Sequence, residues 1–69
     1  MRIKYDESAD ALYIRLKESK YSESDEIKNG FIIDYDENGN IIGLEILDAS
    51  HYLNPQELSS VNYDFRKAG

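Results

Sequence analysis

Apolar and polar side chains alternate along most of the chain from residue 1 to residue 47, and a two-residue period is typical of half-buried β-strands. The alternation is clearest in residues 11–17, where Leu12, Ile14 and Leu16 share one face and a helical period would not produce the pattern. The chain as a whole indicates about five strands, which cover residues 1–6, 11–17, 21–28, 31–36 and 41–47.

Turn-forming residues separate these runs. Residues 6–10 form a polar segment, Asn29-Gly30 is a strong turn signal, and residues 37–40 carry the small residues that a tight hairpin needs. The last two runs then pair as a hairpin. The residues expected to face the core are Phe31, Ile33, Tyr35, Ile42, Leu44 and Ile46.

Helix start signals follow the last strand at Asp48 and at Asn54. Asn54 suits an N-cap, Pro55 suits the first helical position, and Glu57 completes the spacing of a capping box. We therefore predict a small α+β domain, an antiparallel β-meander followed by a short helix over about Pro55–Ser60. Residues 1–48 form the sheet, 49–60 the helical segment, and 61–69 a tail or an extra strand.

Size and charge narrow the function classes. A chain of 69 residues holds one thin core, and the absence of cysteine excludes disulfides and thiolate chemistry. The net charge of −6 and the scattered basic residues argue against nucleic acid and against anionic membranes as partners. No signal-like or membrane-spanning apolar run is present, so we expect a cytoplasmic protein.

One motif matches a known ligand pattern. Asp34, Asp36, Asn38, Gly39 and Glu45 fit the spacing of an EF-hand calcium loop. The flanking segments, however, read as strands rather than helices. The competing interpretation is a hairpin turn with Asp34, Asp36 and Glu45 gathered on one exposed sheet face. Weak, non-EF cation binding by these residues remains the alternative.

No constellation for catalysis is found, so we expect a non-enzyme that needs no cofactor. His51 is the one histidine and reads as a partly exposed helix residue, and no serine lies in a nucleophile motif. Six tyrosines are a surplus in so short a chain. Packing of amphipathic tyrosine rings at the edge of a thin core accounts for most of them. The candidate interaction residues are Tyr13, Tyr63 and Phe65.

The stretches Tyr5–Ile14 and Ile33–Ser50 together resemble the family catalogued as domain of unknown function 2283. The resemblance implies a compact antiparallel sheet followed by a short helix, and no catalytic residues. We expect a protein-interaction module, either a homo-oligomer or a partner of a basic protein. An antitoxin-like role is one version of this expectation, because small domains of this kind are sometimes encoded beside toxin-like proteins.

Overall fold

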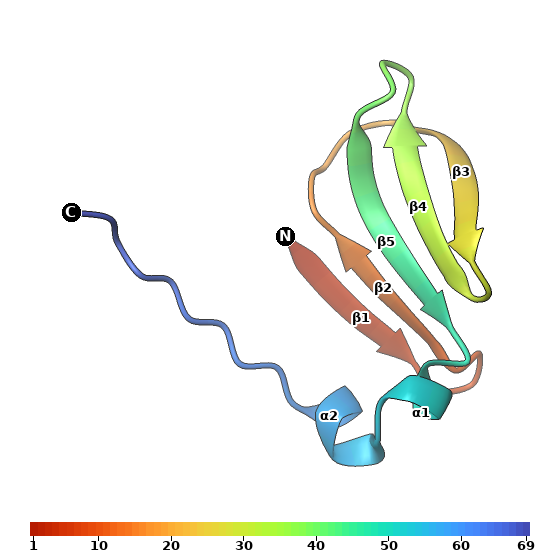
Figure 1. The fold of residues 1–69 in the computed structure, drawn as a ribbon, viewed down its shortest axis with the longest axis vertical. Coiled ribbons are helices and arrows are strands. Elements are labelled where there is room, and N and C mark those ends of the chain that lie inside the picture. Colours follow the sequence, from red (N-terminus) through yellow and green to blue (C-terminus); the bar gives the residue numbers. More distant parts are fainter.

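The computed structural model describes residues 1–69 as a five-stranded antiparallel sheet followed by two short helices (Figure 1). The strands are β1 (Arg2–Asp6), β2 (Ala11–Arg15), β3 (Tyr21–Lys28), β4 (Phe31–Asp36) and β5 (Ile41–Leu47), and the helices are α1 (Ala49–Tyr52) and α2 (Pro55–Ser59). The predicted α+β class and the five predicted strands are confirmed.

The strand order across the sheet is β1-β2-β5-β4-β3. Three of the pairings, β1 with β2, β3 with β4 and β4 with β5, join consecutive strands as in a meander. The fourth pairs β2 with β5, so the chain crosses from β2 to the far edge of the sheet before β3 begins. β1 and β3 are therefore the two edges.

Each turn has a residue that tolerates a left-handed backbone. Gly30 (φ 79°) and Gly39 (φ 81°) end the turns before β4 and β5, as the sequence predicts. Asp10 (φ 50°) ends the first turn, in which the Asp6 carboxylate accepts bonds from the Ser8 and Ala9 backbone N–H groups. The first hairpin is thus closed by aspartates rather than by glycine.

The predicted helix near Pro55 is confirmed. The Asn54 side chain accepts a hydrogen bond from the Glu57 backbone N–H at 2.9 Å, and Pro55 occupies the first turn. α1 begins directly after Asp48, but Asp48 is left-handed (φ 52°) and its side chain makes no capping bond. Neither helix is long and apolar enough to cross a membrane.

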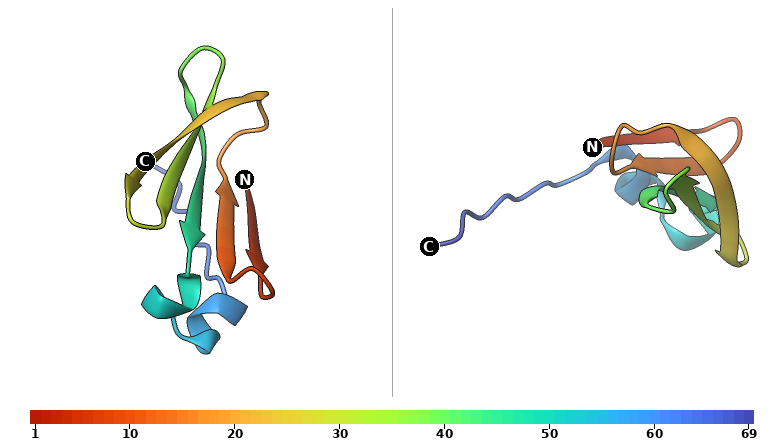
Figure 2. Two further views of the ribbon diagram at one scale, coloured as in Figure 1. Left: turned by 90° about the vertical axis from the view of Figure 1, so that its right-hand side faces the viewer. Right: turned by 90° about the horizontal axis from the view of Figure 1, so that it is seen from above.

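The core is thin. Only 6 of 69 residues are buried, and Ile42 is the one large side chain that is fully enclosed. The register places Phe31 opposite Ile46 and Ile33 opposite Leu44, so these residues share a face as predicted, yet all four remain partly exposed. Figure 2 shows the reason, because α1 and α2 gather at one end of the sheet and leave most of its length uncovered.

One expectation about the opposite face is wrong. Asp34 and Asp36 are 6% and 5% exposed, so these carboxylates are buried rather than solvated. Neighbouring hydroxyls explain how the burial is tolerated: the Ser24 hydroxyl donates to Asp34 at 2.6 Å and the Ser19 hydroxyl donates to Asp36 at 3.1 Å. Buried carboxylates are stable only when they are hydrogen-bonded in this way.

Candidate functional site

The strongest candidate site is an apolar groove between the edge of the sheet and the C-terminal segment. Its floor comes from β1 and β2, and its wall comes from α2 and the residues around it. The apolar residues that line it are Met1, Ile3, Tyr5, Leu12, Ile14, Leu53, Leu58, Val61 and Tyr63. Met1 and Ile3 are 70% and 42% exposed, so the floor of the groove is open to solvent.

Residues 61–69, which we call the arm, leave the groove as an extended chain. The arm forms neither helix nor strand, makes no hydrogen bond, and runs away from the sheet (Figures 1 and 2). Its alternate residues Val61, Tyr63 and Phe65 are 61%, 72% and 74% exposed. The predicted interaction residues Tyr63 and Phe65 therefore belong to this arm, and Tyr63 also lines the groove.

Tyr13 lies elsewhere. It pairs with Lys4 of β1 and Glu45 of β5 on the polar face of the sheet, while its neighbours in β2, Leu12 and Ile14, line the groove on the other face. The Lys4 ammonium lies 5.9 Å from the centre of the Tyr13 ring. The structure thus brings Tyr63 and Phe65 onto one segment and separates Tyr13 from both.

The polar face holds a pair of acids, Asp34 and Glu45. Partial burial raises the pKa of Glu45 from 4.5 to about 7; the adjacent Asp34 carboxylate acts in the same direction, and Arg15 opposes it. Gly43 leaves room for the Asp34 carboxylate, because a Cβ atom there would lie 3.3 Å from one of its oxygens, a close contact.

The other two candidate metal ligands of the calcium-loop motif, Asp36 and Asn38, do not join this pair. The Asp36 carboxylate accepts bonds from the backbone N–H groups of Asn38 and Asn40, at 3.0 and 2.9 Å, which close the β4–β5 turn. These bonds, with that to Asn40 first, lower the pKa of Asp36. Asn38 lies exposed in the turn, and no group of three or more carboxylates or histidines converges anywhere in the molecule.

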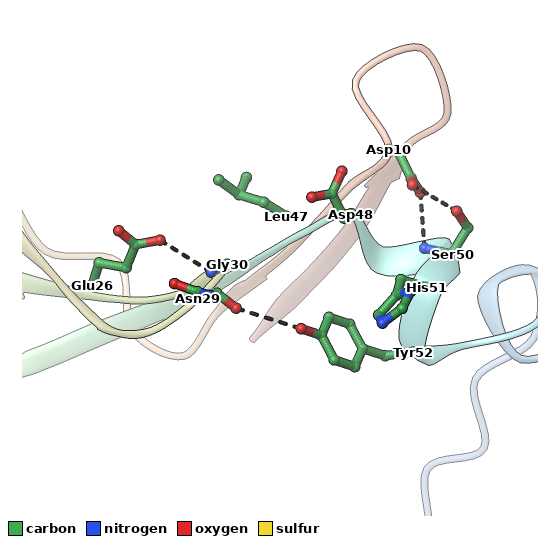
Figure 3. Close-up of a pocket in the computed structure, with 9 residues that line it drawn as sticks. All are labelled: Asp10, Glu26, Asn29, Gly30, Leu47, Asp48, Ser50, His51 and Tyr52. Carbon is green, nitrogen blue, oxygen red and sulfur yellow. Dashed lines mark hydrogen bonds between the residues drawn. The ribbon is translucent and has the colours of Figure 1, made fainter.

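A polar hollow at the end of the sheet brings distant residues together (Figure 3). The Asp10 carboxylate accepts bonds from the Ser50 backbone N–H at 3.0 Å and from the Ser50 hydroxyl at 2.6 Å. The Tyr5 hydroxyl donates to the same carboxylate at 2.7 Å. These bonds, with the Ser50 hydroxyl first, lower the pKa of Asp10, and the bond to Asp10 raises the pKa of Tyr5 to about 12.

The hollow lacks the arrangement of a serine hydrolase. A nucleophilic serine needs an adjacent base that takes its proton, and a carboxylate of lowered pKa is a poor base. Ser50 donates to Asp10, and His51 makes no hydrogen bond to Ser50; instead its ring packs edge-on against Tyr52 at 4.9 Å. His51 is exposed on α1, as the sequence predicts. The contacts of the hollow attach α1 to the first hairpin.

Sequence reasoning missed the groove and the Asp10–Ser50 contact. The alternation of Met1, Ile3 and Tyr5 showed an apolar face on the first strand, and the shortness of the helical segment was the available signal that this face stays uncovered. No local spacing connects Asp10 with Ser50, because forty residues separate them. Such a long-range cap is visible only in three dimensions.

Comparison with known proteins gives a family match and no activity. The searches of the curated proteins and of the solved structures found no match. A family model described as "Protein of unknown function (DUF2283)" matches residues 2–50, which span the whole sheet and the start of α1. The arm and α2 lie outside the matched region. The chain therefore belongs to the DUF2283 family.

Proposed function

We propose that this chain is a non-enzymatic protein-interaction module that associates with itself through the apolar groove. The observation that carries the proposal is the open floor of the groove beside an arm whose alternate side chains are apolar and exposed. Large apolar patches on a small domain mark interaction sites more often than chance exposure. Self-association is also a common way for domains of this size to gain the stability that a thin core does not supply.

The charge of the chain adds a second property to this proposal. With a net charge of −6, the surface favours basic proteins over nucleic acids as additional partners. The exposed acids of β3, Glu23, Asp25 and Glu26, lie on the edge opposite the groove. An antitoxin-like protein would use such an edge against a basic partner. We propose a cytoplasmic location for this activity, since a sequence without cysteine is compatible with a reducing compartment.

Light scattering on a matched pair of variants tests the proposal. Ile3 and Ile27 are both partly exposed isoleucines of edge strands, but only Ile3 lies in the groove. We expect the unaltered chain to be at least a dimer, Ile3→Ser to shift it toward monomer, and Ile27→Ser to leave the mass unchanged. A monomeric parent chain, or equal effects of the two variants, would contradict the proposal.

A further inference from the structure

We propose that two copies of this chain exchange arms, so that the arm of each copy pairs antiparallel with β1 of the other and fills its groove. This inference rests on the proposed function and makes it specific. It names the occupant of the groove as Val61–Phe65 of a second copy, and it predicts a symmetric dimer with two equivalent contacts.

The edges of the sheet differ in how they are protected. β3 has acidic side chains along its length and irregular pairing with β4 on both sides of its centre, which are features that discourage further strand addition. β1 has regular pairing with β2 and no partner on its outer side. The free backbone groups of β1 are therefore the better template for another strand.

The arm has the pattern of that missing strand. Val61, Tyr63 and Phe65 alternate with Asn62 and Asp64, and the arm diverges from the sheet of its own chain in Figures 1 and 2. Val61 and Tyr63 touch only the border of their own groove, and Met1 and Ile3 on its floor stay 70% and 42% exposed, so the arm does not cover the floor of its own chain. A second copy provides a segment with the required alternation.

One antiparallel register satisfies both faces of β1. If Tyr63 lies opposite Ile3, then Phe65 meets Met1 and Val61 meets Tyr5, so that all apolar residues of both segments share the groove face. On the other face the same register sets Asp64 against Arg2. Within its own chain Arg2 forms an ion pair with Glu18, and the two side chains are 70% and 64% exposed. An exposed ion pair contributes little to stability, so Arg2 can exchange Glu18 for Asp64 at little cost.

The contact area is sufficient for a dimer. An aromatic side chain buries about 150–250 Å². Each arm brings Tyr63 and Phe65 and covers a comparable area of the partner's groove. Exchange of both arms therefore approaches the roughly 1,600 Å² of a standard interface.

Disulfide trapping tests the exchange directly, because the native chain contains no cysteine. We expect mixed Ile3→Cys and Tyr63→Cys variants to form a covalent heterodimer on oxidation. The matched control replaces Ile3→Cys with Lys4→Cys, which lies on the other face of β1 and should not cross-link to residue 63. A variant that carries both Ile3→Cys and Tyr63→Cys in one chain should likewise cross-link between chains, and a cross-link within one chain would overturn the proposal. Equal cross-linking by the Lys4→Cys control would also overturn it.

A second pair of variants keeps the test independent of trapping. We expect the full-length variant with Tyr63→Ser and Phe65→Ser to dimerise at least about tenfold more weakly, with an unchanged circular dichroism spectrum. Lys67→Ser, exposed in the arm beyond the paired segment Val61–Phe65 and outside the groove lining, should leave dimerisation unchanged. If both variants stay dimeric and no cross-link forms, arm exchange is wrong while self-association stands. If the unaltered chain is a monomer, the proposed function itself fails.

Discussion

The carboxylate of Asp10 caps a helix that begins almost forty residues later, accepting bonds from both the backbone N–H and the hydroxyl of Ser50. The Asp10 carbonyl also accepts a bond from the Ala49 N–H at 3.0 Å. One residue of the first turn thus satisfies the first two N–H groups of α1, which Asp48 leaves without a side-chain cap. This contact joins the first hairpin to the C-terminal end of the region that the family model matches.

Removal of this cap should destabilise the fold. We expect Asp10→Ala to lower Tm by about 4–8 °C, the shift that the loss of one helix cap produces in a domain of this size. Glu7→Ala, an exposed position in the same turn, is the control and should leave Tm unchanged. Thermal melting followed by circular dichroism measures both. Equal Tm values for Asp10→Ala and the parent would show that the cap does not contribute to stability.

The pH dependence of the free energy of unfolding should reflect pKa shifts of opposite sign, lowered in Asp10 and Asp36 and raised in Glu45. The lowered pKa values of Asp10 and Asp36 contribute stability that is present above their ordinary value of 3.8 and is lost as the pH falls. The raised pKa of Glu45 acts in the opposite sense, because its contribution is complete below 4.5 and is lost as the pH rises through about 7. Stability should therefore be greatest between the ordinary values of 3.8 for the aspartates and 4.5 for Glu45, and should decline on both sides.

The Glu45→Gln variant isolates the loss of stability that the raised pKa of Glu45 causes as the pH rises. The amide does not ionise, so urea denaturation of this variant should show no decline in the free energy of unfolding between pH 5 and 8, whereas the parent declines. Glu37→Gln, at an exposed position in the β4–β5 turn, should decline as the parent does. A variant at position 45 that follows the parent curve would rule out Glu45 as the source of the decline.

Gly43 should not accept a side chain. An added Cβ would lie 3.2 Å from the Ile14 carbonyl oxygen as well as 3.3 Å from Asp34. The carbonyl belongs to β2, which is paired with β5, so it cannot withdraw without disturbing that pairing. We expect Gly43→Ala to lose about 1 kcal/mol in urea denaturation. An increase in stability would mean that the sheet relaxes around the methyl group.

Calcium should leave the protein unchanged. The Asp36 carboxylate is occupied by turn N–H groups and the Glu45 carboxyl is partly protonated near neutral pH, so the motif offers few free charged oxygens. We expect millimolar calcium to produce no heat in calorimetry and no shift in Tm. A saturable rise in Tm that Asp34→Asn abolishes would instead support the cation-binding alternative.

The sequence predicted the elements of the fold well because they are encoded locally. The alternation in β2, the glycine turns before β4 and β5, and the Asn54–Glu57 cap all depend on neighbours within a few residues. The family resemblance was confirmed over residues 2–50. Tyr63 and Phe65 were selected from their alternation, and the structure places both on the exposed arm.

What the sequence did not predict depends on how strands pair. Parity alone placed Asp34 and Asp36 on a solvated face, but β3 and the segment before it bring the Ser24 and Ser19 hydroxyls onto these carboxylates, ten and seventeen residues away in the chain. The partnering of β2 with β5 rather than β3 likewise decides which strands are edges. The groove follows from that order, because it is the uncovered side of the edge formed by β1.

Sedimentation equilibrium of the unaltered chain tests the central claim, self-association through the groove, most directly. The account predicts a mass of twice the 8.0 kDa chain at micromolar concentrations, with dissociation on dilution. A single species of 8.0 kDa at every concentration up to the millimolar range would contradict it.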